Sequence, residues 1–519
     1  MNNVLEWLEK SATNYPDKIA FADVENTITY KDLDVESDIL ASILIRDEEV
    51  KERQAIAFYL EKCVDATVGM FATLKSRAFY SFIDLRSPKT RQTKVIETLM
   101  PKIIFTDDEN YAEAISMFSS YPNTKIISLE TLLSDIRKEL ETKSYEDLSE
   151  RELLVKRRQT ALSNDPVYVN FTSGSTGTPK GVVVGHASII DFIEVFTKTF
   201  DLNKNDIWAN QAPFDFDVSV KDIFASISVG GTVNIIPRGY FSNPTALMDY
   251  LVERKPTVLV WAVSAMCFVS IMNGFGYKVP TSVKKVIFSG EVMPIKQLNV
   301  WKKYLPEATY VNVYGPTEIT CNCTYHVVDR DYDLKEVIPA GRAFENEHVF
   351  LLNDNDEEIT SAGEVGEICV AGACLALGYY KDKEKTSKAF MPNPANHEFL
   401  EMMYRTGDLG RYDEDGLLYY VSRKDFQVKH MGQRIELGEI EVAASSKENV
   451  ERSCCLYDNN KKKILLFVMG NADKKELLDE LRKDLPSYMI PNKVIMIDEM
   501  PMTKNGKIDR NALKQVVGL

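Results

Sequence analysis

The sequence predicts an α/β protein with largely parallel sheets, a more β-rich segment after Glu345, and a small separate module at the C-terminal end. Apolar strand-like runs alternate with segments of helical apolar spacing, such as 187–200, and this alternation is typical of layered α/β folds. The strand-like runs are residues 102–106, 167–171, 181–184, 258–261, 285–288 and 310–313. The β-rich segment contains the runs HVFLL, GEICVAG and GLLYYVS.

Composition places the chain among globular proteins and argues against a general role in nucleic-acid binding. Its 519 residues are 45% hydrophobic and 27% charged, and the net charge is −15. A nucleic-acid binder needs a basic face, so this balance argues against that class. Residues 424–519 carry 17 basic and 15 acidic side chains, or +2, which leaves −17 on residues 1–423. This asymmetry predicts two parts joined at a short hinge.

Cysteine usage predicts a reducing, cytoplasmic location. The eight cysteines are scattered and form no CxxC pair, and the five histidines show no zinc-ligand spacing. The N-terminus carries acidic residues and has no apolar core typical of a signal peptide. Residues 256–277 are uncharged, but they contain serine, asparagine and glycine, so we expect a buried strand and helix instead of a membrane span.

The segment FTSGSTGTPKG at 171–181 predicts a polyphosphate-binding loop. Its glycines allow tight turns and close approach of an anion, while hydroxyl groups, backbone N–H groups and one lysine supply donors. It differs from a Walker A loop, in which the lysine is followed by serine or threonine. The candidate nucleotide-binding residues of this loop are Thr172, Ser173, Gly174, Ser175, Thr176, Gly177 and Lys180.

Taken with four further motifs in order, the loop resembles the nucleotide loop of the acyl- and aminoacyl-adenylating enzyme superfamily. The chain is similar to this superfamily, which includes nonribosomal peptide adenylation domains and acyl-CoA synthetases, over essentially its whole length. The further motifs are NVYGPTE at 312–318, YRTGD at 404–408, SRKD at 422–425 with Lys429, Gly432 and Arg434, and PMTKNGKIDR at 501–510.

The resemblance implies a fold and a two-step reaction. The implied fold has a body of two layered α/β subdomains and a β-rich subdomain (1–423), and a small mobile α+β domain (424–519) that turns about Asp425. In the implied reaction a substrate carboxylate attacks the α-phosphate of ATP, pyrophosphate leaves, and a thiol then displaces AMP from the acyl-adenylate.

The resemblance also implies residue roles in catalysis. Lys507 is expected to meet the α-phosphate and the substrate carboxylate, where positive charge lets two anions approach. Glu318 is expected to hold Mg²⁺. Thr172 of the phosphate loop completes the implied catalytic residues. Gly432 is expected to face the thiol arm, because a missing side chain leaves room for it.

The remaining nucleotide contacts follow from the same resemblance. Asp408 is expected to accept hydrogen bonds from the ribose hydroxyls, with Arg423 nearby. Tyr314 is expected to stack on adenine, and Asn312 to bind its exocyclic amine. Gly315 and Thr317 belong to the same nucleotide motif.

The segment NQAPFDFDVSVKD at 210–222 resembles the pocket wall of members that activate amino acids. There an aspartate at the position of Asp217 pairs with the α-ammonium group of the substrate, a strong contact in a partly dry pocket. The alternative is that Asp217 caps a helix that starts at Ser219. The pocket positions implied by the resemblance are Asp217, Val218, Lys221, Ala262, Ile287, Ser289, Val313, Cys321 and Asn322.

Among these members the chain looks most similar to the D-alanine–carrier protein ligases of the teichoic acid pathway. D-alanine is therefore the first expectation, and the thiol acceptor is the phosphopantetheine of a carrier protein. Those ligases have an apolar residue where this chain has Lys221, and a cysteine where it has Ser289. Lys221 is expected to point into solvent or else to meet a carboxylate on an acidic substrate.

Two other enzyme interpretations and one non-enzyme interpretation stay open. A stand-alone nonribosomal peptide adenylation enzyme acting on another, acidic amino acid is the main rival. An acyl-CoA synthetase is disfavoured by Asp217, and a non-catalytic nucleotide binder by the presence of both Lys507 and Glu318. The carrier protein is expected to dock on the basic C-terminal module, which displays 461–463 and 474–475 as lysine runs.

Overall fold

The computed structural model describes residues 1–174, 178–424, 427–502 and 508–519, and it divides into two compact units. The first unit comprises Met1–Ile83, Leu99–Asn170 and Gly181–Ser422. The second comprises Asp84–Thr98, Phe171–Lys180 and Arg423–Leu519. The sequence did not predict that two short segments from the N-terminal half, one of them the phosphate loop, would group with the C-terminal segment.

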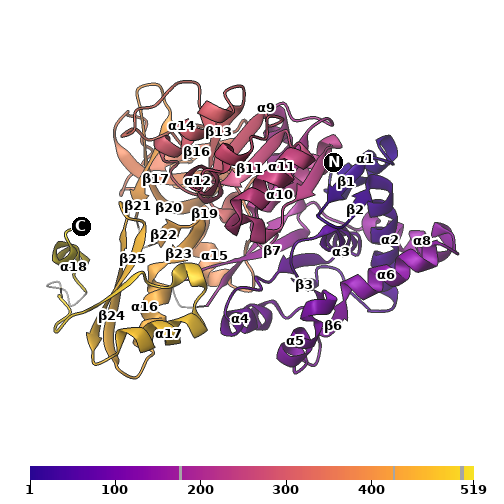
Figure 1. Ribbon diagram of the computed structural model, residues 1–519, viewed down its shortest axis with the longest axis horizontal. Helices are drawn as coiled ribbons and strands as arrows, with labels where there is room; N and C mark the ends of the chain where they lie inside the picture. The colour runs from indigo at the N-terminus through magenta and orange to yellow at the C-terminus, as the bar shows by residue number, and fades with distance from the viewer. Residues whose placement is uncertain (175–177, 425–426, 503–507) are drawn as a thin grey trace. The chain divides into compact units, whose positions relative to one another are not determined.

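The first unit contains a nine-stranded sheet whose six central strands are parallel (Figure 1). Antiparallel strands close both of its edges. In spatial order the strands are β15 (Arg342–Ala343), β14 (Thr324–Val327), β13 (Thr309–Tyr314), β12 (Lys285–Ser289), β11 (Val258–Ala262), β9 (Ile207–Asn210), β10 (Thr232–Ile235), β1 (Ile19–Ala22) and β2 (Thr27–Thr29). The runs expected at 258–261, 285–288 and 310–313 are thus confirmed as strands.

A second, seven-stranded sheet carries the strand that leads into the phosphate loop. Its order is β18 (Gly378–Tyr379), β8 (Lys180–Gly185), β7 (Pro166–Thr172), β4 (Phe79–Phe82), β3 (Ala55–Tyr59), β5 (Ile103–Thr106) and β6 (Lys125–Ser128). The pairs among β4, β3, β5 and β6 are parallel, as is the pair of β7 with β4. The expected runs at 102–106, 167–171 and 181–184 are confirmed here.

Helices cover the two sheets and share one large apolar core with them. The helix expected at 187–200 is confirmed as α9 (His186–Thr199), whose buried side chains recur at helical spacing. In Figure 1 α2, α6 and α8 lie side by side. The helices of this unit are α1 (Leu5–Asn14), α2 (Tyr30–Arg46), α3 (Val64–Lys75), α5 (Asp108–Phe118), α6 (Leu129–Leu140), α7 (Tyr145–Leu148), α8 (Arg151–Gln159), α9, α10 (Val218–Val229), α11 (Pro244–Arg254), α12 (Val263–Ile271), α13 (Gly274–Tyr277), α14 (Ile295–Tyr304) and α15 (Lys383–Ala389).

The uncharged stretch 256–277 forms strand β11 followed by helices α12 and α13, as expected. Helix α12 has only nine residues, too few to cross a membrane. Among the described residues, no helix is both long and apolar enough to span one.

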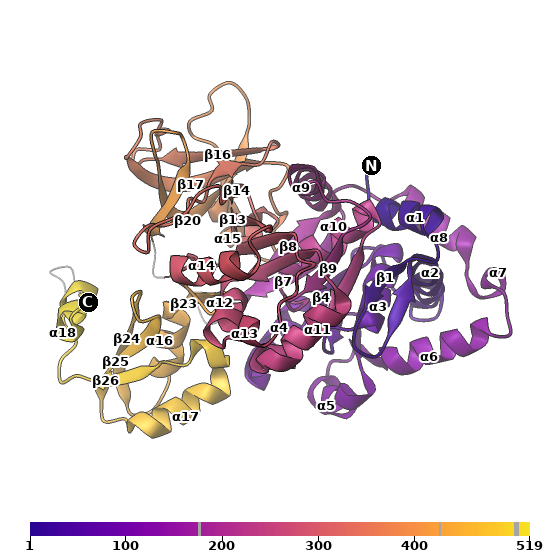
Figure 2. The same ribbon diagram turned by 45° about the horizontal axis from the view of Figure 1, so that its top comes forward.

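The β-rich segment after Glu345 is a five-stranded antiparallel sheet (Figure 2). Its strands are β16 (Glu347–Leu352), β17 (Val365–Gly372), β19 (Phe390–Pro392), β20 (Met402–Tyr412) and β21 (Leu418–Arg423). The long strand β20 carries the expected ribose motif, because it contains residues 404–408.

The second unit is a small α+β module, as predicted. A hairpin of β22 (Gln427–His430) and β23 (Gln433–Glu436) is followed by a three-stranded sheet of β24 (Val450–Asp458), β25 (Lys463–Gly470) and β26 (Lys493–Met496). Helices α16 (Leu437–Ser445) and α17 (Lys474–Asp484) pack with this sheet around an apolar core. Helices α4 (Lys89–Leu99) and α18 (Arg510–Val517) complete the module.

A buried ion-pair cluster fixes the start of β7, the strand that leads to the phosphate loop. Asp165 is 2% exposed and accepts hydrogen bonds from Arg77 Nη2 at 2.7 Å and Arg53 Nε at 2.6 Å. Burial raises the pKa of Asp165, but the Leu162 N–H and the two guanidinium groups outweigh it and lower that pKa. Because the folded pKa is lowered, this stabilisation is present above the unfolded pKa and is lost as pH falls through the folded one.

We predict that Asp165→Asn destabilises the protein by up to about 3–5 kcal/mol, because the buried Arg77 guanidinium then keeps only the half-exposed Glu52 as a counter-charge. Denaturant unfolding followed by circular dichroism would measure the loss. A matched control is Asp249→Asn, which removes an exposed ion pair with Lys278 and should leave the unfolding midpoint unchanged. Equal midpoints for the two variants would contradict the role assigned to the buried cluster.

Candidate functional site

The phosphate loop starts where strand β7 ends, at Thr172. Gly174 is required there, because a Cβ atom at this position would lie 2.1 Å from the Thr178 carbonyl oxygen. Thr172 Oγ1 is buried and has no hydrogen-bond partner among the described residues. A buried hydroxyl without a partner is costly, so this atom suits a ligand oxygen. The expected contacts Ser175, Thr176 and Gly177 lie outside the described residues.

Within the second unit, the loop's donors already bind carbonyl and carboxylate oxygens. Ser173 Oγ donates to the Arg434 carbonyl oxygen at 2.7 Å and accepts from Glu436 N at 3.3 Å. Lys180 Nζ lies 3.4 Å from Glu436 Oε1. This set of donors therefore has the chemistry that binds anions.

A second carboxylate, Glu439, contacts the same loop. Burial raises the pKa of Glu439, whereas the Arg91 guanidinium and the Gly174 N–H oppose that rise. Arg91 Nη1 donates to Glu439 Oε1. The segment Asp84–Thr98, which supplies Arg91, thereby joins the phosphate loop and the C-terminal module in one unit.

In the first unit, the expected adenine and ribose residues contact each other directly. Tyr314, the last residue of β13, donates its hydroxyl to Asp408 Oδ2 at 2.5 Å, and both side chains are buried. Burial, together with the Asp408 charge, raises the pKa of Tyr314 well above its ordinary value. Asn312 Nδ2 donates to the Pro339 carbonyl at 2.7 Å, which leaves Oδ1 as the acceptor of this amide.

Glu318, the expected Mg²⁺ ligand, is fully buried and accepts a hydrogen bond from Tyr379 Oη at 2.8 Å. The described residues contain no group of three or more His, Cys, Asp or Glu side chains that could hold a metal. One carboxylate still fits Mg²⁺, which commonly takes its other ligands from substrate phosphates and water. Glu318 would hold the ion, which would neutralise phosphate charge.

The expected pocket residues come from the start of α10 and from the carboxyl ends of three adjacent parallel strands. Ala262 and Ser289 are register partners across β11 and β12, and Ile287 lies on the same face of β12 as Ser289. Val313 lies near the end of the next strand, β13. Helix α10, which carries Val218 and Lys221, packs against β11. Carboxyl ends of parallel strands are where ligands bind in open α/β sheets.

Asp217 directly precedes α10, and its side chain makes no capping hydrogen bond. The helix begins at Val218, so Asp217 is its N-cap residue, and the carboxylate accepts a hydrogen bond from the Val218 N–H. The side-chain bond to the second or third helical N–H that the capping alternative requires is absent. Burial raises the pKa of Asp217, while a hydrogen bond from Thr317 and the positive charge of Lys221 partly offset this rise. The carboxylate is thus held beside the nucleotide motif, and it interacts electrostatically with Lys221.

Lys221 does not point into solvent, and that expectation is wrong. The side chain is fully buried, and its Nζ donates to Asn322 Oδ1 at 2.6 Å. The ammonium also lies beside the Cys321 thiol, whose pKa burial raises to about 12 although Lys221 opposes the rise. The sequence pattern did not reveal this burial, because nearly the whole of α10 is buried and its pattern marks no solvent face.

The backbone after the nucleotide motif has unusual φ angles just before and at the last two expected pocket residues, Cys321 and Asn322. Thr320 and Cys321 have φ angles of 57° and 90°, a left-handed conformation that is uncommon for side chains of this kind. A Cβ atom at Gly315 would lie 2.5 Å from Asn322 Cα, so this glycine allows residues 321–323 to pass close by. Strain of this kind often accompanies functional sites.

For the other expected residues, the structure gives either no description or only a position along the backbone. Lys507 and the hinge residue Asp425 lie outside the described residues, and their roles stay predictions. Arg423 is the last residue of β21. Gly432 follows Met431 in the turn between β22 and β23, with φ angles of 78° and 53°. Two positive φ angles are typical of a tight hairpin turn, which gives this glycine a structural reason besides its expected role at the thiol arm.

Sequence reasoning missed three residues that support the site. Lys62 Nζ binds Asn210 Oδ1 at 2.8 Å and the Gln211 carbonyl at 2.9 Å, at the start of the pocket-wall segment 210–222. Asp222 Oδ2 accepts from Asn210 Nδ2 at 2.7 Å, and Tyr379 positions Glu318. Lys62 has no local signal in the sequence, whereas Asp222 lies inside the motif at 210–222.

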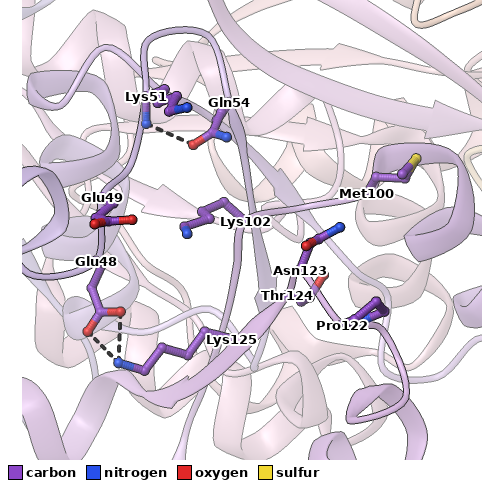
Figure 3. A pocket seen from close by; sticks show the side chains of 10 residues that line it. All are labelled: Glu48, Glu49, Lys51, Gln54, Met100, Lys102, Pro122, Asn123, Thr124 and Lys125. Carbon is purple, nitrogen blue, oxygen red and sulfur yellow. Dashed lines mark hydrogen bonds and ion pairs between the residues drawn. The ribbon is translucent and has the colours of Figure 1, made fainter.

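A surface hollow of about 590 Å³ lies elsewhere on the first unit (Figure 3). Gln54 precedes β3, Lys102 precedes β5, and Lys125 begins β6, so the hollow lies at the amino ends of these parallel strands. Lys125 is paired with Glu48 at 2.6 Å. Ligands in open α/β sheets bind at the opposite, carboxyl ends, so this hollow is separate from the candidate site.

Comparison with known proteins agrees with these motifs. Residues 8–380 match the AMP-binding enzyme family, and residues 439–507 match the AMP-binding enzyme C-terminal domain. A mycosubtilin synthase polypeptide of Bacillus subtilis is 32% identical over 97% of this chain, which spans only 19% of that protein. D-alanine–D-alanyl carrier protein ligase of Staphylococcus epidermidis is 30% identical over 100% of both chains.

A solved structure shares the fold. The Vibrio cholerae adenylation domain AlmE, in complex with glycyl-adenosine-5′-phosphate, aligns with a TM-score of 0.83 at 21% identity and covers 100% of this chain and 98% of that one. The family match extends over well more than half of the sequence. The chain therefore belongs to the AMP-binding enzyme family.

Proposed function

We propose that the protein activates an α-amino acid with ATP and transfers it to the phosphopantetheine thiol of a carrier protein. The observation that carries the amino-acid part is Asp217, a carboxylate that makes no side-chain capping hydrogen bond and lies beside Thr317 of the nucleotide motif. A substrate α-ammonium gives this carboxylate a counter-charge. A fatty acid offers none, which disfavours an acyl-CoA synthetase.

In the proposed first step a carboxylate oxygen of the amino acid bonds to the α-phosphorus of ATP. The bond from that phosphorus to the oxygen bridging to the β-phosphate breaks, and pyrophosphate leaves with the electron pair. Lys507 and the phosphate loop would supply positive charge and donors, and Glu318 would hold the Mg²⁺. In the second step the carrier thiolate bonds to the acyl carbon, and AMP leaves.

The identity of the amino acid has two candidates. D-alanine is supported by the full-length likeness to the Staphylococcus epidermidis ligase. The burial of Lys221 favours the second candidate, an amino acid with an acidic side chain, because an alanine methyl group gives the buried ammonium no counter-charge. The likeness to much longer synthases favours neither candidate over the other.

The first prediction for this function is that the protein exchanges labelled pyrophosphate into ATP only when a suitable amino acid is present. The assay should cover L- and D-amino acids, with acetate and a fatty acid as substrates that lack an α-ammonium group. Amino acid-dependent exchange follows from reversible adenylate formation. If no member of the panel supports exchange, the proposed function is wrong.

Lys507→Ala should lower pyrophosphate exchange by roughly 10²- to 10³-fold, because charge at the reacting phosphate is lost. ATP binding, measured by calorimetry, should be largely retained. The control is Lys514→Ala, an exposed lysine of helix α18 nearby in the sequence. Full exchange activity in the Lys507 variant would remove that residue from the proposed mechanism.

Carrier loading should depend on the basic surface of the second unit. Lys461, Lys462 and Lys463 are exposed where the chain turns from β24 into β25. Replacing all three with Gln should slow the loading of an acidic carrier roughly threefold to tenfold at low salt, while exchange stays unchanged. If the rate of carrier loading changes neither with this replacement nor with ionic strength, the carrier docks elsewhere.

A further inference from the structure

Four charged side chains lie close together at the proposed amino-acid pocket. Lys62, Lys221 and Asp222 are buried, with exposed fractions of 9%, 0% and 0%, and Asp217 is partly buried. Lys221 interacts electrostatically with both Asp217 and Asp222. Buried charges need counter-charges, so the balance within this group limits what the pocket can accept.

Asn210 links Lys62 to Asp222 through two hydrogen bonds. The Asn210 amide accepts from Lys62 at 2.8 Å and donates to Asp222 at 2.7 Å. Burial lowers the pKa of Lys62 to about 7, although the negative charge of Asp222 opposes this shift. Burial raises the pKa of Asp222 to about 7, although the hydrogen bond from Asn210 opposes that shift. The pair is neutral overall both when the proton is on Lys62 and when it has moved to Asp222.

Lys221 is balanced differently. Its hydrogen bond goes to the neutral Asn322 amide, and no carboxylate of a described residue lies within 4.0 Å of its nitrogen. Asp217 and Asp222 both act on Lys221, and Asp222 also acts on Lys62. Among these four side chains two positive charges face two negative ones, so the balance depends on Asp217. Glu318 also interacts with Asp217, but Mg²⁺ would take up its charge in the proposed function.

Substrate binding removes this balance. In the proposed function, on which this inference rests, the α-ammonium group pairs with Asp217. The pocket then holds one more positive charge than negative, at Lys221. A neutral side chain leaves that charge uncompensated in a buried site, whereas a carboxylate on the substrate restores neutrality.

The neighbouring polar groups suit a carboxylate as well. Since Asn322 Oδ1 accepts from Lys221, the Nδ2 of the same amide is a donor, and no described residue is bonded to it. The Ser289 hydroxyl, 5% exposed, also lacks a hydrogen bond to any described residue. A carboxylate has lone pairs for three such donors.

We propose that the pocket selects an amino acid with a side-chain carboxylate, and that Lys221 and Asn322 are the residues that recognise it. Lys221 supplies the charge, and Asn322 holds its ammonium and donates a second hydrogen bond. The pocket walls formed by Val218, Ala262, Ile287 and Val313 are apolar and confine the side chain.

The test is pyrophosphate exchange with the intact protein and matched amino acids of both chiralities: aspartate with asparagine, glutamate with glutamine, and alanine. We expect an acidic amino acid to exceed its amide by roughly 10- to 100-fold in kcat/KM, as a charge-assisted contact provides. Lys221→Met should abolish this preference by raising the KM of the acid, with the KM of ATP unchanged. Lys296→Met, an exposed lysine of α14, is the control.

A second variant, Asn322→Asp, keeps the inference testable if Lys221→Met fails to fold. The new carboxylate pairs with Lys221 inside the protein, so the charges balance once the α-ammonium group of a neutral amino acid pairs with Asp217. We expect this variant to lose the acidic substrate and to gain relative activity with a neutral one. Lys221→Arg, which keeps the charge, should retain part of the preference for the acid.

The outcomes separate this inference from the proposed function. Exchange that is strongest with alanine or another neutral amino acid, and that keeps its preference in Lys221→Met, would overturn the acidic-substrate inference while leaving amino-acid activation intact. An absence of exchange with every amino acid would instead reject the proposed function itself.

Discussion

A buried charge must have a counter-charge, and this constraint organises the first unit around the start of α10. Lys62 gathers the carbonyl groups that follow β9, and Asn210 links it to Asp222. The segment 210–217 is thereby tied to the sheet before it reaches Asp217. An apolar residue at position 62 would leave three carbonyl groups without this donor and would remove one of the two cations that act on Asp222.

The need for counter-charges also bears on how a pocket discriminates between substrates. A pocket closed only by apolar walls discriminates weakly, because one methylene changes the binding free energy by about 1–3 kcal/mol. A buried polar group discriminates more strongly, since a substrate without the matching group leaves it unpaired. In the proposed pocket, Lys221 and Asn322 would be polar groups of this kind, whereas the strand residues Ala262 and Val313 would set only its size.

The sequence predicted the strands and motifs because their signals are local. Apolar runs marked β11, β12 and β13, and ordered motifs marked the phosphate loop and residues 312–318. Burial of Lys221 could not be predicted, because it depends on which elements pack around α10. Lys62 was also missed, because it is about 150 residues from the carbonyl groups it binds. The positive φ of Cys321 likewise has no signature in a single sequence.

The phosphate loop shows a competition that bears on the proposed cycle. Ser173, Gly174 and Lys180 contact groups on β23 and the start of α16, namely the Arg434 carbonyl, Glu436 and Glu439. A polyphosphate needs those same donors, and its charge repels both glutamates. If ATP binds there as proposed, it would compete with these acceptors for the loop. In the proposed function, adenylate formation requires β23 and α16 to leave the phosphate loop. After pyrophosphate departs, the return of β23 and α16 again provides acceptors for the donors of the loop.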